Sequence, residues 1–214
     1  MAASIVATAV AVFALASGSL PIQVPFVESV AVATGGWSVN LLSRNRPAGW
    51  FIGLVSVTAF GWVFVEARLY AEVGIQVFYF ITSLQAIYLW LRGGQHGAQR
   101  PVSHASLRLI VATAPLFLVS LLALRFLLVE MNGAAPFWDA LTTVMSLTAH
   151  IYLMWRFVES WYIWIAVDII YVPLYLSRGL RLTAALYVVF LLMSISGLVR
   201  FRKLAGASVP EAVP

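Results

Sequence analysis

Long apolar segments separated by short polar connections dominate this 214-residue sequence. An α-helix needs about 20 such residues to cross the hydrocarbon core of a bilayer. Only 10% of the residues are charged, whereas soluble domains carry about 25%. The sequence therefore predicts an all-α membrane protein. We expect core transmembrane helices at about 26–43, 50–65, 69–91, 105–129, 136–157, 160–177 and 180–201.

The two ends of the chain extend beyond these segments. Residues 1–20 are apolar, and we expect an extra N-terminal helix within 1–24, because prolines at positions 21 and 25 then interrupt a helix. Nine of the 13 Lys and Arg residues fall on the membrane side that carries the C-terminus, if the seven core helices alternate in direction. The positive-inside rule then predicts a cytoplasmic C-terminus, with 204–214 as a cytoplasmic tail.

Composition excludes several classes of function. The formal charge is +5, but the basic residues are scattered singly, a pattern that indicates topology and contact with anionic lipid headgroups rather than nucleic acid. The absence of cysteine excludes disulfides and thiolate metal sites. His96, His104 and His150 are too dispersed for an obvious metal site, and common enzyme motifs are absent. We expect no enzyme, metal or cofactor.

The sequence also contains a weak internal repeat. When the chain is aligned with itself, 25–90 matches 136–201 without a gap, and Trp50 is paired with Trp161. Few of the aligned residues are identical, but helix starts, loops and acidic residues coincide. The alignment predicts two three-helix units, with one helix between them.

This arrangement has a topological consequence. We expect a first unit at 25–92, a linker helix at 104–130 and a second unit at 136–203. Because three helices and one linker precede the second unit, it enters the membrane in the same direction as the first. Such parallel repeats form one transporter architecture, with substrate bound near mid-membrane at the repeat interface. An ancestral duplication in a membrane protein of another role would leave the same pattern.

The segment 160–179 combines an apolar span with an acidic residue at its middle, Asp168. A mid-membrane aspartate costs about 2.5–3.5 kcal/mol on insertion scales, so it normally faces protein or a water-filled cavity. Spacings of three and four place five residues on one helix face: Trp161, Trp164, Asp168, Tyr171 and Tyr175. An aromatic face beside a carboxylate suits a flat organic ligand. An aspartate that only bridges two helices is the alternative.

Two other spans carry polar stripes. The stripe of the third core helix is formed by Gln76, Tyr79 and Ser83. The stripe of the fifth core helix is formed by Asp139, Thr142, Thr143, Ser146 and His150. Amides, hydroxyls and an imidazole can orient a ligand, but they also join helices through hydrogen bonds. Both interpretations stay open for these residues.

Several motifs resemble those of the PnuC-type vitamin transporters. They are Trp50-x-Ile-Gly53-x-x-Ser56, Leu69-Tyr-Ala-Glu-x-x-x-Gln76, Asp139-Ala-Leu-Thr-Thr-Val-x-Ser146, Glu159-x-Trp161-x-x-Trp164-x-x-x-Asp168-x-x-Tyr171-x-x-x-Tyr175 and Gly179-Leu-x-Leu-Thr183-Ala-x-Leu-Tyr187. The resemblance covers about residues 26–203. Members of this family carry nicotinamide riboside, and relatives carry thiamine or riboflavin.

The resemblance implies two parallel three-helix units joined by a linker helix, as in the SWEET sugar transporters. It also implies facilitated vitamin uptake across the bacterial inner membrane, with cytoplasmic phosphorylation trapping the vitamin, and it allows a homo-oligomer such as a trimer. It places the ligand among Gln76, Tyr88, Ser146, Trp161, Trp164, Asp168, Tyr171 and Tyr187. His150, which stands where the family commonly has glutamine, completes our set of candidate substrate-binding residues.

The chain departs from the family pattern at several positions. Gly49 and Ser160 precede tryptophans where the family usually has asparagine, and Gln85–Trp90 lacks part of the usual aromatic motif. Nicotinamide riboside is therefore the first expectation for the cargo, with thiamine and riboflavin as alternatives. A membrane subunit that binds or senses without transporting is the second class of function. Proton coupling through Asp168 or His150 also stays open.

Overall fold

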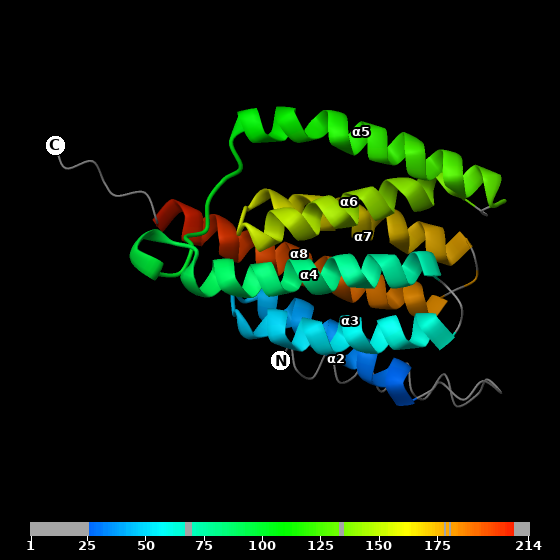
Figure 1. Cartoon of the computed structure of the whole chain (residues 1–214), viewed down its shortest axis with the longest axis horizontal. Helices are drawn as coiled ribbons and strands as arrows, with labels where there is room; N and C mark the ends of the chain where they lie inside the picture. Colours follow the sequence, from blue (N-terminus) through cyan, green and yellow to red (C-terminus); the bar gives the residue numbers. More distant parts are fainter. Residues whose placement is uncertain (1–25, 67–69, 133–134, 178, 180, 208–214) are drawn as a thin grey trace. The chain divides into compact units, whose positions relative to one another are not determined.

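In this computed structural model, the described residues are 26–66, 70–132, 135–177, 179 and 181–207. Within them the chain forms seven α-helices and a short 3-10 helix, η1 (Gln95–Gly97) (Figure 1). The α-helices are α2 (Phe26–Ser43), α3 (Ala48–Glu66), α4 (Tyr70–Arg92), α5 (Leu107–Glu130), α6 (Pro136–Met154), α7 (Glu159–Ser177) and α8 (Arg181–Ala207). The expected N-terminal helix lies outside the described residues.

All seven segments predicted as core spans form helices, and two of their ends differ from the prediction by three residues or more. Helix α6 ends at Met154 instead of continuing to 157, because Arg156 adopts a left-handed φ of 60° in the turn that follows. Helix α8 continues to Ala207, so the first residues of the expected tail are helical. The buried side chain of Ala205 shows that this last turn packs against the protein.

By length and composition, five of the described helical segments can cross a membrane: Ala48–Glu66, Glu72–Arg92, Leu107–Glu130, Glu159–Ser177 and Thr183–Ala207. Helices α2 and α6 are not among them, and α6 carries Asp139, His150 and several hydroxyl side chains. The most apolar span is α5, none of which is buried inside the protein. The protein is a multi-pass membrane protein.

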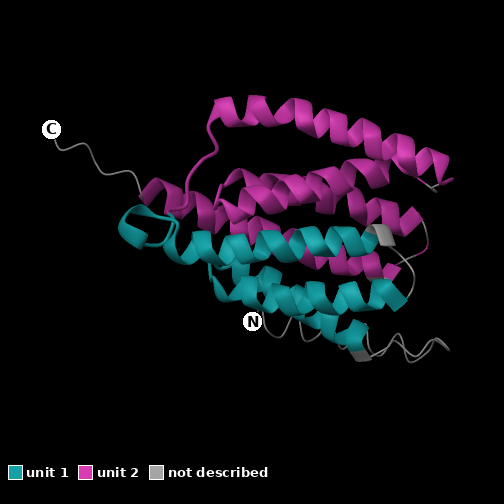
Figure 2. Ribbon diagram, in the orientation of Figure 1, with its two compact units in different colours: residues 1–100 teal, residues 101–214 magenta. Residues whose placement is uncertain are grey.

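The helices belong to two compact units, residues 1–100 and 101–214 (Figure 2). In the first unit α2 packs on α3 and α3 on α4; in the second, α5 packs on α6, α6 on α7 and α7 on α8. The helix that we expected as a linker, α5, therefore groups with the second unit. Consecutive helices are neighbours in both units, as short connections require.

The turns between α2 and α3 and between α6 and α7 have the same conformation. Asn45 and Arg156 occupy the left-handed region with φ of 56° and 60°. A few residues later, the backbone N–H groups of Trp50 and Trp161 each donate to the carbonyl three positions earlier, at 3.0 and 3.1 Å. The members of both pairs occupy corresponding positions in the internal repeat found in the sequence.

Each of these tryptophans contacts a ring on the next helix of the chain. Trp50 meets Trp90 edge-on, with centroids 5.7 Å apart and an interplanar angle of 80°. Trp161 meets Phe201 in the same way, at 5.4 Å and 74°. All four rings are buried. Such edge-to-face pairs contribute about 0.5–1.5 kcal/mol beyond their buried area, so they help to hold α3 to α4 and α7 to α8.

Hydroxyl groups join α2 to α3. Ser38 of α2 donates to the carbonyl of Gly49 at 2.8 Å, and Ser56 of α3 donates to the carbonyl of Ala31 at 2.7 Å. These short bonds need closely approaching backbones, which small residues permit. A Cβ added at Gly49 would lie 2.9 Å from the Ser38 carbonyl oxygen and 2.6 Å from Cγ of Leu42.

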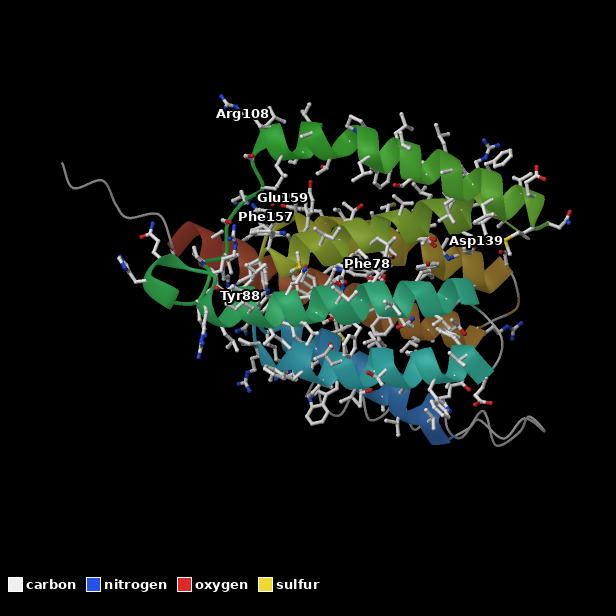
Figure 3. The ribbon with its side chains drawn as sticks, viewed as in Figure 1. Phe78, Tyr88, Arg108, Asp139, Phe157 and Glu159 are labelled. Atoms are coloured by element: carbon white, nitrogen blue, oxygen red, sulfur yellow. The ribbon has the colours of Figure 1, made fainter. Side chains whose placement is uncertain are left out.

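The segment before α5 is attached to the turn between α6 and α7. Ser103 donates its N–H to the Arg156 carbonyl at 3.2 Å and accepts from the N–H of Val158 at 3.0 Å. The Glu159 carboxylate accepts from the N–H of Ala105 at 2.8 Å, and its other oxygen lies 2.8 Å from Nδ1 of His104. Figure 3 shows Glu159 beside this segment. Glu159 therefore ties the start of α7 to the start of α5.

The side chain of Arg156 is buried in this turn. Removal from water disfavours its charged form, and burial lowers the pKa of Arg156 to about 10. The turn after α6 therefore contains a buried guanidinium.

We predict that Gly49→Ala lowers the free energy of unfolding by about 1–3 kcal/mol, the typical cost of overpacking. The added methyl group must displace Leu42 and the backbone of α2. Thermal unfolding in detergent measures the effect. Gly74→Ala on α4 is the matched control, because no atom lies within 4 Å of its added Cβ. Equal melting temperatures for the two variants would refute this account of α2–α3 packing.

We also predict that Glu159→Ala releases the segment before α5. The amide of Ala105 loses its acceptor, so its hydrogen exchange should accelerate by about tenfold or more, corresponding to about 1.4 kcal/mol for a charge-assisted hydrogen bond. Exchange mass spectrometry of this region measures the change. The matched control is Glu130→Ala at the exposed end of α5. Unchanged protection in Glu159→Ala would contradict the proposed attachment.

Candidate functional site

The aromatic and acidic face predicted for residues 160–179 exists on one continuous helix, α7. Its residues contact α8 at three levels along the helix pair. The first level is the tryptophan already described, the second is a carboxylate–hydroxyl pair, and the third is a cluster of tyrosines. We call this line of contacts the α7–α8 seam; it consists of Trp161, Asp168, Tyr171 and Tyr175 on α7 and Tyr187, Ser194, Gly197 and Phe201 on α8.

At the first level, Trp161 is only 1% exposed. Its indole lies against Gly197, and Phe201 contacts it edge-on. The indole N–H is buried and has no hydrogen-bond partner among the described residues. Trp164, one turn further along α7, is half-buried. The two tryptophans therefore differ: one is enclosed by α8 and the other keeps accessible surface.

At the second level, Asp168 is 3% exposed and accepts a hydrogen bond from Oγ of Ser194 at 3.0 Å. Ser194 is equally buried. A carboxylate in this position needs such a donor, because an unpaired charge in the membrane interior is costly. The bond involves one carboxylate oxygen, Oδ2, so Asp168 does join two helices, as the alternative interpretation of the sequence requires.

At the third level, Tyr171, Tyr175 and Tyr187 form a cluster. The ring centroids are separated by 5.4 Å (171 to 175), 4.6 Å (171 to 187) and 5.1 Å (175 to 187). Tyr187 also meets Phe190 edge-on at 5.7 Å. Tyr171 interacts with Thr142 of α6, so the cluster connects three helices of the second unit.

The remaining candidates lie on α6 and α4. Ser146 and His150 of α6 are half-buried and lie two and three turns after Asp139. Asp139 and Glu159 lie toward opposite ends of the second unit (Figure 3). Gln76 of α4 is half-buried, whereas Tyr88 near the end of α4 is 63% exposed (Figure 3). Gln76 and Tyr88 belong to the first unit and the other seven candidates to the second.

Four residues of the seam were missing from the sequence-derived set: Tyr175, Ser194, Gly197 and Phe201. Tyr175 was predicted on the aromatic face from its spacing, but it was not included among the candidate substrate-binding residues. Ser194 could have been found from the internal repeat, since it corresponds there to Ser83, which belongs to the predicted polar stripe. Gly197 and Phe201 carry no chemical signal in the sequence, because a glycine and a phenylalanine are ordinary in an apolar span.

This arrangement supports non-covalent recognition. It offers aromatic faces, one carboxylate and several hydroxyls, which can stack on a flat ring and orient polar substituents. Among the described residues, no group of three or more His, Cys, Asp or Glu side chains could hold a metal ion. The seam can provide hydrogen bonds, ring contacts and the carboxylate of Asp168.

Comparison with known proteins connects this fold to transport. The family model described as nicotinamide mononucleotide transporter matches residues 25–203. The nicotinamide riboside transporter PnuC of Escherichia coli (strain K12) is 26% identical over 198 residues, which cover 80% of this chain and 83% of the relative. The protein of the same name from Neisseria mucosa is 22% identical over 191 residues, covering 84% and 73%.

A solved structure shares the fold. The crystal structure of the vitamin B3 transporter PnuC superimposes with a TM-score of 0.71 at 20% sequence identity, and the match covers 97% of this chain and 93% of the solved one. The family model spans all seven described α-helices except the end of α8. The chain therefore belongs to the nicotinamide mononucleotide transporter family, a family of transporters and not of enzymes.

Proposed function

We propose that this protein mediates facilitated uptake of nicotinamide riboside across the bacterial inner membrane. The relatives that match most of its length are named nicotinamide riboside transporters. The observation that carries the proposal is the buried carboxylate of Asp168, which lies on the α7 face between tryptophans and tyrosines. A pyridinium ring is flat and cationic, and aromatic faces and a carboxylate both favour such a group.

Within this site we assign different roles to the residues. Trp164 keeps accessible surface, so it is the ring that stacks on the pyridinium, with Trp161 behind it. Asp168 accepts a ribose hydroxyl or orients the neighbouring rings, and Ser194 orients Asp168. Tyr171, Tyr187, Ser146 and His150 supply further polar contacts, and Gln76 and Tyr88 stay sequence-based candidates on the first unit.

We further propose that the two units are parallel repeats, 25–92 and 136–203, with α5 as the linker and the C-terminus in the cytoplasm. Both ends of α3 correspond in the internal repeat to the ends of α7, and the two edge-on ring pairs also occupy corresponding positions. Such units can alternate access by rocking as rigid bodies. The homotrimer allowed by the family resemblance is the oligomeric state that we propose.

The second unit differs from the first in ways that suit a ligand site. Phe60 and Phe64 stack at 5.8 Å in the first unit, at the positions that correspond to Tyr171 and Tyr175. Val57 corresponds to Asp168. The shared geometry therefore needs no hydroxyl or carboxylate at these positions, and the polar groups of the second unit serve another purpose, which we assign to cargo recognition.

A non-transporting binding or sensor subunit is the second candidate. One observation favours it: Asp168 is buried against α8 and bonded to Ser194, as expected of a residue that joins helices. Saturable uptake distinguishes the two candidates, because a sensor binds its ligand without moving it across the membrane.

We predict that the purified protein binds nicotinamide riboside in titration calorimetry, and that vesicles containing it take up this compound saturably. Trp164→Ala should weaken binding by about tenfold or more, because a desolvated cation–π contact contributes about 1–2 kcal/mol. Trp62→Ala on α3, an exposed tryptophan in a span of the first unit, is the control. Tighter binding of thiamine or riboflavin would reassign the cargo, and binding without uptake would favour the sensor.

We predict that Ser194→Ala weakens binding by roughly threefold to twentyfold, because the hydrogen bond that orients Asp168 is worth about 0.6–1.7 kcal/mol in a membrane. Asp168→Asn should reduce affinity further, since it removes the charge that attracts a pyridinium. The matched control is Ser196→Ala, an exposed serine on the same helix. If Ser194→Ala and Asp168→Asn both bind as the unmodified protein does, Asp168 has only a structural role.

A further inference from the structure

The contact between Trp161 and Gly197 is closer than any side chain at position 197 would allow. An ideal Cβ built on Gly197 would lie 2.6 Å from Cδ2 of Trp161 and 2.7 Å from its Cε2 and Cε3. Real Cβ atoms essentially never approach other heavy atoms within 3.0 Å. The indole therefore lies flat on the backbone of α8, and only glycine leaves this space.

This contact sits between the other contacts of the seam. On α8, Ser194 precedes Gly197 by three residues and Phe201 follows it by four, so all three share one face. Ser194 meets Asp168 and Phe201 meets Trp161 on α7. The distance between α7 and α8 at Gly197 thus limits how closely Ser194 can approach Asp168.

Several other described glycines lack this constraint, although Gly49 also has contacts too close for a side chain. The added Cβ of Gly206, also on α8, meets no atom within 4 Å. The added Cβ atoms of Gly35 and Gly53 approach serine Oγ atoms at 2.9 Å, but a hydroxyl can rotate away. The fused ring system facing Gly197 cannot rotate away without moving the whole indole, which is enclosed by its surroundings.

The first unit has a methyl group at the corresponding position. Ala86 is the counterpart of Gly197 in the internal repeat and is fully buried. The edge-on pair of that unit, Trp50 and Trp90, has centroids 5.7 Å apart, against 5.4 Å for Trp161 and Phe201. The first unit thus keeps a buried edge-on ring pair with a methyl group at this position, whereas in the second unit the indole of Trp161 occupies the space that a methyl group would need.

From these contacts we infer that Gly197 is a positioning residue for the cargo site: it lets Trp161 lie flat on α8 and so sets the helix separation at which Ser194 orients Asp168. Gly197 itself does not touch the cargo. The inference rests on the proposed function, because it assigns Trp161 and Asp168 to cargo recognition. Adding a methyl group at 197 forces the indole off α8 and moves Asp168 away from its donor.

The experiment compares Gly197→Ala with Gly206→Ala in calorimetric titrations with nicotinamide riboside, which yield the dissociation constant and the number of sites separately. We expect Gly197→Ala to raise the dissociation constant by about tenfold with one site per chain retained, and Gly206→Ala to leave both values unchanged. A purely structural role would reduce the number of sites or the melting temperature without changing the dissociation constant. That result, or unchanged binding by Gly197→Ala, would overturn the inference.

A double-mutant cycle with Trp161→Phe tests whether the effect passes through the indole. Phenylalanine lacks the fused ring atoms that face Gly197. Gly197→Ala should therefore raise the dissociation constant much less in the Trp161→Phe background than in the unmodified protein. An equal increase of the dissociation constant in both backgrounds would overturn the inference. If Gly197→Ala alone does not fold, recovery of folded protein by Trp161→Phe supports the contact, and failure to recover contradicts it.

The same cycle separates this inference from the proposed function. If the unmodified protein does not bind nicotinamide riboside, the proposed cargo is wrong. The melting temperatures of the four proteins then decide whether Gly197 packs against Trp161, the contact that the inference requires. If the double variant loses less melting temperature than the sum of the two single variants, the contact between position 197 and Trp161 is supported. Additive losses overturn it.

Discussion

The hydrocarbon interior of a membrane contains no water that could satisfy a polar group, and the structure of this protein depends on that constraint. Hydroxyls inside the helices donate to backbone carbonyls, as Thr148 does to Val144 at 2.8 Å. Between helices, Ser38 bonds to the backbone of α3. Asp168 is the most costly polar group to place in a span, and it receives a hydroxyl from α8. The pairing of α7 with α8 therefore follows from the same requirement that makes every span helical.

Close packing is the second requirement, because lipid tails are as apolar as the side chains and burial alone does not hold helices together. Both units meet it with a tryptophan from the second helix and an aromatic ring from the third. Small residues then decide how near the backbones come, as at Gly49 and Gly197. The second unit places a carboxylate and three tyrosines on this common framework, so recognition chemistry and packing occupy the same helix pair.

The positions of the helices and the chemical face of α7 were predictable, because both depend on local periodicity. The end of α6 was not, since the left-handed conformation of Arg156 has no sequence signal of the kind that a glycine would provide. The seam partners on α8 were harder still. A helix with apolar residues all round can turn any face toward its neighbour, so periodicity does not identify Ser194, Gly197 and Phe201 as the contacts of α7.

By itself the sequence determined that this chain is a helical membrane protein, where its core spans lie, and that Asp168 shares a helix face with aromatic residues. These properties follow from composition and from spacing along one helix. Only the tertiary structure decided that Trp161 is enclosed while Trp164 keeps accessible surface, that Ser194 is the donor to Asp168, and that α5 packs with the second unit. The physical reason is that the rotation and separation of neighbouring helices are set by interlocking side chains from segments far apart in the sequence, and no single segment contains that information.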